Sequence, residues 1–186
     1  LEAYALYRLN FAVNTMVTDT TLEVTEAIGT SQRALAAIWR YLLAIDWVAR
    51  IEASWLPLDH PLLLWLLEPR RLRFALGEAL WVRLIDVGAA LAARSLEEGS
   101  VVVDIRDELC PWNEGSWAIQ DGAVERTTDD ADLRLGVTEL GSVYLGGLTF
   151  DQLLRAGRLE ELRPGGAARA DGLFRTPRQP WCPELF

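Results

Sequence analysis

The chain has 186 residues, 51% of them apolar, and a formal net charge of -9 at pH 7. The apolar content supports one large or two small buried cores. The acidic charge argues against nucleic acid as a partner, because phosphate binding depends on clustered Lys and Arg, and it favours encounters with cationic small molecules or basic peptides.

The first part of the chain predicts a sheet with one helix. Residues 3–9 alternate in the manner of a half-buried strand, and residues 21–28 do so again with β-branched residues. Thr30 or Ser31 can cap a helix whose apolar residues follow at helical spacing. A third strand is expected over residues 47–55. This order of elements predicts an α+β layer with the helix packed on the sheet.

A dense run of prolines marks a joint in the chain. It surrounds a short apolar helix that we expect over residues 62–67. We therefore predict two domains, residues 1–73 and residues 74–186. No stretch reaches the roughly 18 uncharged apolar residues that a membrane span needs, so no span is expected.

The second domain is expected to centre on residues 101–160. An alternating strand over residues 79–85 and a helix over residues 87–96, capped by Asp86, lead into it. The central stretch predicts a strand, a turn, a Trp-containing strand, an Asp-Gly hairpin, a further strand and two short amphipathic helices. A short Ala-rich helix is expected over residues 164–174.

The last residues, 175–186, are expected to form an extended tail. Pro177, Pro180 and Pro183 lie within it. Proline fixes its own backbone φ angle and pushes the preceding residue towards an extended conformation, so a regular helix is excluded here.

Few residue types offer catalytic chemistry. His60 is the only histidine, and no nucleophile lies near it in sequence, so a structural role is favoured. All 18 basic side chains are arginine, which removes lysine-based covalent chemistry. Cys110 and Cys182 lack CxxC spacing, which favours free thiols in a reducing cytosol over a disulfide.

Two further patterns invite a binding role and are better explained without one. The acidic cluster of Asp129, Asp130 and Asp132 lacks the glycine and distal glutamate of a calcium loop, so a solvated turn is expected and no metal site is predicted. The pair Gly146 and Gly147 does not follow a strand and open a helix, so helix termination is preferred over a phosphate loop.

The junction Gly29-Thr30-Ser31-Gln32 invites comparison with the pyrophosphate loop of acetyltransferases of the GNAT superfamily. Such a loop follows a strand, opens a helix and holds an anion with backbone amides. It usually reads [RQ]xxGx[GA], whereas here a single glycine is followed by bulky residues. We therefore expect no cofactor site in this chain.

Several segments together resemble the C-terminal half of the enhanced intracellular survival (Eis) family of GNAT acetyltransferases. They are AYALYRL, ALAAIWRYLLAID, VRLIDVGAALAAR, PWNEGSW and the run from ADLRL to AGRLE. The resemblance implies an α+β fold. Residues 1–73 would end a second, cofactor-less GNAT-like α/β layer. Residues 74–186 would form a domain similar to sterol carrier protein 2, with a mixed sheet covered by helices.

The resemblance also implies a function. Members of the family transfer an acetyl group from acetyl-CoA to amines, including those of aminoglycosides and lysine side chains. The free carboxylate of the C-terminal residue, here Phe186, would act as the general base, and Glu184 would attract a cationic substrate. Acetyl-CoA would bind an N-terminal GNAT domain not present in this chain, so the chain alone is expected to be inactive. A cytoplasmic homo-oligomer, a hexamer in the family, is expected.

A different class of function stays open. Domains of the sterol carrier type can enclose a hydrophobic tunnel, so the chain could instead be a non-catalytic module that binds lipid or another protein. A bound fatty acyl ligand would favour this alternative, whereas dependence of acetyl transfer on the terminal carboxylate would favour the enzyme.

Overall fold

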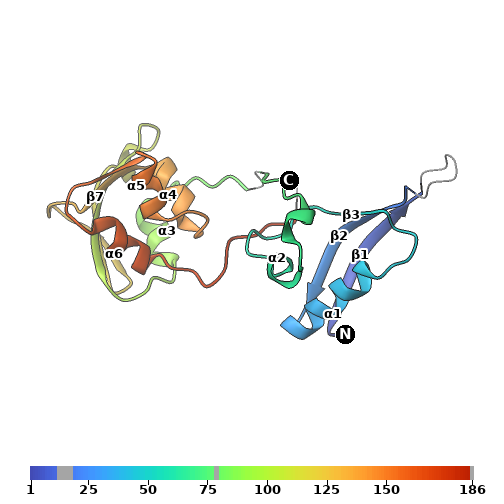
Figure 1. Ribbon diagram of the computed structural model, residues 1–186. Helices are drawn as coiled ribbons and strands as arrows, with labels where there is room; N and C mark the ends of the chain where they lie inside the picture. The colour runs from blue at the N-terminus through green and yellow to red at the C-terminus, as the bar shows by residue number, and fades with distance from the viewer. Residues whose placement is uncertain (12–18, 78–79, 185–186) are drawn as a thin grey trace. The chain divides into compact units, whose positions relative to one another are not determined.

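The computed structural model describes residues 1–11, 19–77 and 80–184. These residues form two compact units (Figure 1). The first comprises Leu1–Leu72 together with residues 181–184 of the tail, and the second comprises Arg73–Pro180. Within the described ranges, no helix has both the length and the apolar character needed to cross a membrane.

The first unit is built on a three-stranded sheet in the order β1-β2-β3. Strand β1 (Ala3–Asn10) runs antiparallel to β2 (Thr21–Gly29), and β2 runs parallel to β3 (Arg50–Ala53). Helix α1 (Gln32–Leu43) connects β2 to β3 and lies against β1 and β2 (Figure 1). The first two predicted strands and the helix are confirmed, and Ser31 caps α1 by accepting from the Ala34 N–H.

Two predictions for this unit overestimated the length of an element. The strand expected over residues 47–55 is only Arg50–Ala53, because Trp47 and Trp55 have φ angles of 65° and 60°, outside the extended region. The helix expected over residues 62–67 is α2 (Leu62–Trp65), which stops where Leu66 becomes extended. A 3-10 turn, η1 (Pro69–Leu72), follows.

The core of the first unit lies between α1, α2 and the sheet. Its buried members come from β2, α1 and α2: Leu22, Val24, Trp39, Leu42 and Leu62. Burying one such aliphatic side chain contributes about 1.5–3 kcal/mol, so these few residues account for much of the packing of a unit this small.

The second unit is a five-stranded mixed sheet in the order β6-β5-β4-β7-β8. Only the β4/β7 pair is parallel. The strands are β4 (Ser100–Arg106), β5 (Gly115–Gln120), β6 (Ala123–Arg126), β7 (Leu133–Gly136) and β8 (Leu159–Glu161). The helices are α3 (Val87–Ala93), α4 (Val137–Tyr144), α5 (Phe150–Arg155) and α6 (Gly166–Leu173), with a 3-10 turn η2 (Pro111–Asn113) before β5.

Most of the order predicted for residues 101–160 is confirmed. The Asp-Gly hairpin joins β5 to β6, and both Asp121 and Gly122 have positive φ angles (47° and 82°), as a type I′ turn requires. The helices α4 and α5 follow β7 as expected. The sequence analysis missed β8, whose three residues are too few to show an alternating pattern.

The prediction of a strand over residues 79–85 is wrong for the residues that the structure describes. Residues 80–84 have no strand pairing, and Ala79 lies outside the described residues. The alternation arises because Leu84 is buried in the core, whereas the partly exposed Arg83 forms an ion pair with the buried Asp107 carboxylate. The next element, α3, is capped by Asp86 as predicted but ends at Ala93, because Arg94 is extended.

Candidate functional site

The C-terminal tail is the segment to which the sequence assigns chemistry. Phe186, the predicted general base, lies outside the described residues. Glu184, the predicted substrate-attracting side chain, is exposed, and its backbone carbonyl accepts from the Cys182 thiol at 3.5 Å. Residues 175–184 contain no helix or strand, as predicted.

The described end of the tail is fastened to the first unit. The indole Nε1 of Trp181 donates a hydrogen bond to the backbone carbonyl of Trp55. Trp55 lies just after β3, so the contact is made at one end of the parallel β2/β3 pair. The sequence analysis missed this contact, although a lone tryptophan in a proline-rich tail is a signal for an anchor, since tryptophan buries a large area.

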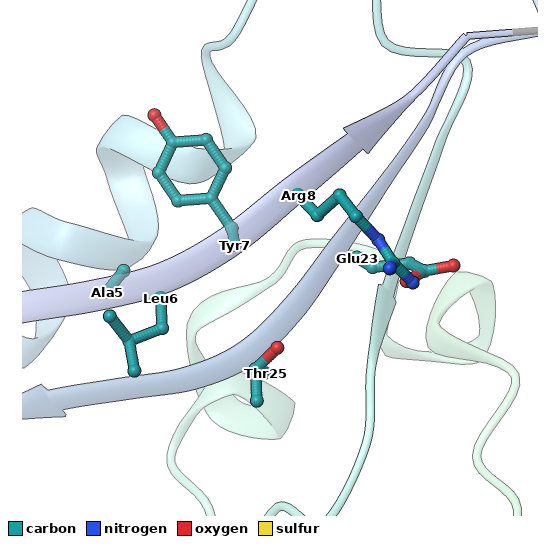
Figure 2. Close-up of a pocket in the computed structure, with 6 residues that line it drawn as sticks. All are labelled: Ala5, Leu6, Tyr7, Arg8, Glu23 and Thr25. Carbon is teal, nitrogen blue, oxygen red and sulfur yellow. The ribbon is translucent and has the colours of Figure 1, made fainter.

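A shallow groove lies on the first unit beside the register shift between Leu6 and Tyr7 in the β1/β2 pair (Figure 2). Its volume is about 440 Å³, and it is lined by Ala5, Leu6, Tyr7, Arg8, Glu23 and Thr25. Bulges often redirect side chains next to binding sites. In Figure 2, Arg8 and Glu23 point toward one another, and they form an ion pair.

The chemistry of this groove is limited. The Tyr7 hydroxyl lies 2.8 Å from the Tyr41 hydroxyl of α1, and this hydrogen bond raises the pKa of Tyr7 above its usual value. The phenol therefore keeps its proton at neutral pH and is a poor proton acceptor. The opposite charges of the Arg8 and Glu23 side chains compensate each other in their ion pair. The groove can hold a polar ligand, but its lining contains no cysteine, histidine or lysine side chain.

The junction between β2 and α1 has only some of its backbone amides free to hold an anion such as the pyrophosphate of coenzyme A. Such a loop needs free backbone N–H groups at the helix N-terminus. Here the Thr30 N–H donates to the Glu2 carbonyl at 2.8 Å, and the Ala34 N–H donates to the Ser31 hydroxyl at 3.2 Å. Gly29 lies so close to α1 that a Cβ atom would be 2.8 Å from the Cα of Leu35. The glycine thus serves strand-to-helix packing.

In the acidic cluster of Asp129, Asp130 and Asp132, one side chain has a structural role. Asp129 and Asp130 are exposed, but the prediction of a solvated turn is wrong for Asp132, which is 7% exposed. Its carboxylate accepts from the Val102 N–H at 2.8 Å and from Arg169 at 2.6 Å, which joins β4 to α6. Within the described part of the chain, no group of three or more His, Cys, Asp or Glu side chains could hold a metal ion.

His60 lies in the core of the first unit, 6% exposed, with its ring 5.4 Å from that of Trp39. Its Nδ1 accepts from the Leu62 N–H at 3.2 Å, so the proton of the neutral ring sits on Nε2. Burial lowers the pKa of His60, and the nearby Asp59 offsets part of this effect. These contacts support the structural role. Cys110 and Cys182 are free thiols, as predicted.

Comparison with known proteins assigns a family to each part of the chain. Residues 1–84 match a family model described as an acetyltransferase (GNAT) domain, and residues 87–183 match one described as a sterol carrier protein domain. The sequence analysis expected domains over residues 1–73 and 74–186. The matched acetyltransferase range therefore extends further along the chain than the expected first domain.

Similar proteins are found in actinobacteria. An uncharacterized N-acetyltransferase of Streptomyces coelicolor is 38% identical over 100% of this chain and 46% of its own length. The N-acetyltransferase Eis of Mycobacterium tuberculosis is 32% identical over 93% of this chain and 42% of its own length. The crystal structure of Eis1 from Mycobacterium abscessus is 34% identical, with a TM-score of 0.86 over 99% of this chain and 48% of that chain. The chain spans about half the length of these relatives.

Proposed function

Since the chain belongs to the sterol carrier protein domain family over residues 87–183, and also carries an acetyltransferase (GNAT) domain over residues 1–84, we propose that it is the C-terminal part of an acetyl-CoA-dependent N-acetyltransferase. Its Eis-like relatives carry the name N-acetyltransferase. The proposed substrates are amines of the aminoglycoside type or of lysine side chains. The chain's formal charge of -9 suits cationic acceptors of this kind.

We propose that the terminal carboxylate of Phe186 acts as the general base. A carboxylate held beside the substrate nitrogen takes up its proton and leaves the nitrogen lone pair free to attack an acyl group. An α-carboxylate in water has a pKa of about 3.3–3.7 and is a weak base. Removal from water raises that pKa, and a fixed position next to the amine raises the effective concentration of the base.

The observation that carries this proposal is the packing of the tail. The described residues 181–184 belong to the compact unit that matches the acetyltransferase domain, and Trp181 donates to the Trp55 carbonyl within that unit. The described end of the tail therefore packs on the acetyltransferase layer of this chain. In this proposal the exposed Glu184 carboxylate attracts the cationic amine.

We propose further that acetyl-CoA binds outside this chain, in an N-terminal GNAT domain of the same protein, and that the chain alone is inactive. In support of this proposal, the Thr30 and Ala34 amides at the β2–α1 junction already have acceptors within the protein. The relatives also have about twice the length of this chain, which leaves room for another domain. Assembly into a cytoplasmic homo-oligomer, a hexamer by resemblance, belongs to the same proposal.

The base assignment can be tested by adding one glycine after Phe186 in the full-length protein. We expect acetyl transfer to an aminoglycoside amine, followed through release of the coenzyme A thiol, to fall at least about 100-fold, because the carboxylate is displaced by one residue. A glycine inserted into the exposed loop between Thr127 and Asp129 is the control and should leave turnover unchanged. Unimpaired turnover of the extended protein would rule out the base.

Lipid binding by the second unit is the other candidate, and the match to a sterol carrier protein domain favours it. Its described interior is filled by side chains with no exposed area, among them Leu91, Ile105, Ile119, Leu133 and Leu140. The groove described above lies on the first unit. Native mass spectrometry of the purified protein decides between the two: a co-purified fatty acyl ligand would support the carrier role.

A further inference from the structure

Several groups of the second unit hold the first residues of the tail in place. Helix α6 ends at Leu173. The next residue, Phe174, caps the helix, is 4% exposed and packs edge-on against Phe150 with ring centroids 5.0 Å apart. Arg94 donates through Nη2 to the Phe174 carbonyl at 2.6 Å, and its guanidinium lies 4.6 Å above the Phe174 ring. The same Arg94 donates through Nε to the Tyr144 carbonyl at 2.7 Å. One arginine therefore joins the start of the tail to the end of α4.

The tail then passes over the turn between α4 and α5, which two glycines form. Gly146 ends α4 with a φ angle of 83°, and a Cβ atom there would collide with the Thr176 side chain. A Cβ atom on Gly147 would lie 3.4 Å from the Cγ of Pro180. The glycine pair therefore does more than end a helix. Because these two residues have no side chains, Thr176 and Pro180 of the tail can lie against the turn.

Two interactions restrict the tail beyond this surface. The Thr176 hydroxyl donates to the Arg178 carbonyl at 3.0 Å, which fixes a local turn. Trp181 then donates its indole N–H to the Trp55 carbonyl. Contacts at residues 174, 176, 180 and 181 therefore follow one another along a segment that has no regular secondary structure of its own.

We propose that Arg94 and the Gly146–Gly147 turn are positioning residues for the C-terminal tail, and that together they hold residues 174–180 on one path, the tail track. A free tail that carries a terminal group samples many positions, whereas fixed points before residue 182 leave only a short segment free. The catalytic consequence rests on the proposed function, because the group that the tail track aims is the Phe186 carboxylate.

The first test measures the tail track without any acetyl transfer. Trypsin can cut after the exposed Arg178 and release a peptide that runs from Gln179 to Phe186, and cleavage reports how often a segment leaves its native position. In the intact polypeptide, we expect Gly147→Leu to speed release of this peptide about fivefold or more, because its Cβ would already contact Pro180 and the rest of the side chain would crowd the tail. Mass spectrometry of timed samples quantifies the peptide.

Gly172→Leu is the matched control, because no atom lies within 4 Å of a Cβ built on Gly172 and its φ angle is ordinary. It should leave release of the peptide at the wild-type rate. Equal release from the two leucine variants would overturn the tail track. Arg94→Lys provides a second variant, which keeps the positive charge. It should speed release at least about twofold, because lysine lacks the planar fork that donates to both the Phe174 and the Tyr144 carbonyl, and an unchanged rate would also overturn the proposal.

The second test separates the tail track from the proposed function. In the full-length enzyme, Gly147→Leu should lower kcat about tenfold and leave the KM for the amine unchanged, because a misplaced base affects the chemical step. If the extension after Phe186 abolishes turnover but Gly147→Leu leaves kcat unchanged, the tail track is wrong and the base stands. If the extension has no effect, the base is wrong, and the protease experiment still decides the tail track.

Discussion

His60 is a titratable residue that has a structural role because it is buried. Its Nδ1 must be unprotonated to accept from the Leu62 N–H at the start of α2. Protonation would place two N–H groups against each other inside the core. Burial accordingly lowers the pKa of His60, and Asp59 only partly offsets the effect. The unfolded chain therefore binds this proton more tightly than the folded chain does.

This difference predicts how stability depends on pH. The contribution of His60 is fully present above the unfolded pKa of about 6.5 and is lost as the pH falls below it, by at most about 1.4 kcal/mol per pH unit. We expect urea unfolding followed by circular dichroism to show a smaller decrease between pH 7.5 and 5.5 for His60→Asn than for the wild type, because Asn keeps an acceptor but does not titrate. Equal decreases would contradict the assignment.

Other residue contacts could not be predicted from sequence, because their partners are distant along the chain. Asn113 is 1% exposed and accepts from the Val87 N–H at 2.9 Å, and it also donates to the Ile85 carbonyl at 3.1 Å and to the Asp107 carboxylate at 2.9 Å. Burial alone would raise the pKa of Asp107, but hydrogen bonds from Asn113, the Cys110 N–H and Arg83 outweigh it and hold the pKa below its usual value. No local pattern encodes such a network.

At the scale of elements, α3 illustrates how a glycine can be required inside a helix. A Cβ atom on Gly88 would lie 2.6 Å from the ring of Trp117 on β5. Helix propensity alone favours alanine over glycine by about 1 kcal/mol. The close contact between helix and strand opposes this preference, because a packed core accepts an added methyl group only by shifting its neighbours.

We therefore predict opposite effects for two Gly→Ala substitutions. Gly88→Ala should lower the free energy of unfolding by about 1–3 kcal/mol, since Trp117 must move. Gly172→Ala, in α6 with open space around it, should raise that free energy by about 0.5–1 kcal/mol. Urea denaturation of the two variants and the wild type measures both shifts, and a stabilising Gly88→Ala would show that α3 does not pack this closely.

The predictions of helices and strands succeeded where a sequence pattern has one structural cause, and they failed where the same pattern can arise from two different structures. The alternation in β1 and β2 and the Asp121-Gly122 turn were sufficient to place their elements. The same alternation at residues 80–84 comes from a loop that buries Leu84 and pairs Arg83 with Asp107. Alternation shows which side chains are buried. It does not show whether the backbone has a strand beside it.

At the scale of the whole molecule, the combination of a GNAT domain with a sterol carrier domain, expected from the resemblance, is confirmed by the family matches over residues 1–84 and 87–183. The course of the tail was not predictable to the same degree. Its link between Trp181 and Trp55 joins residues separated by 126 positions, and only the folded chain brings them together. The proposed tail track and the proposed terminal base therefore depend on the folded chain and not on any one sequence motif.

The most direct measurement of the central claim changes only the charge of the last group. Peptide ligation can give the full-length protein a C-terminal carboxamide on Phe186, which keeps the shape of the residue but cannot accept a proton at neutral pH. We predict that kcat for amine acetylation falls about 100-fold or more, with release of the tail peptide by trypsin unchanged. Full activity of the carboxamide form would contradict the account.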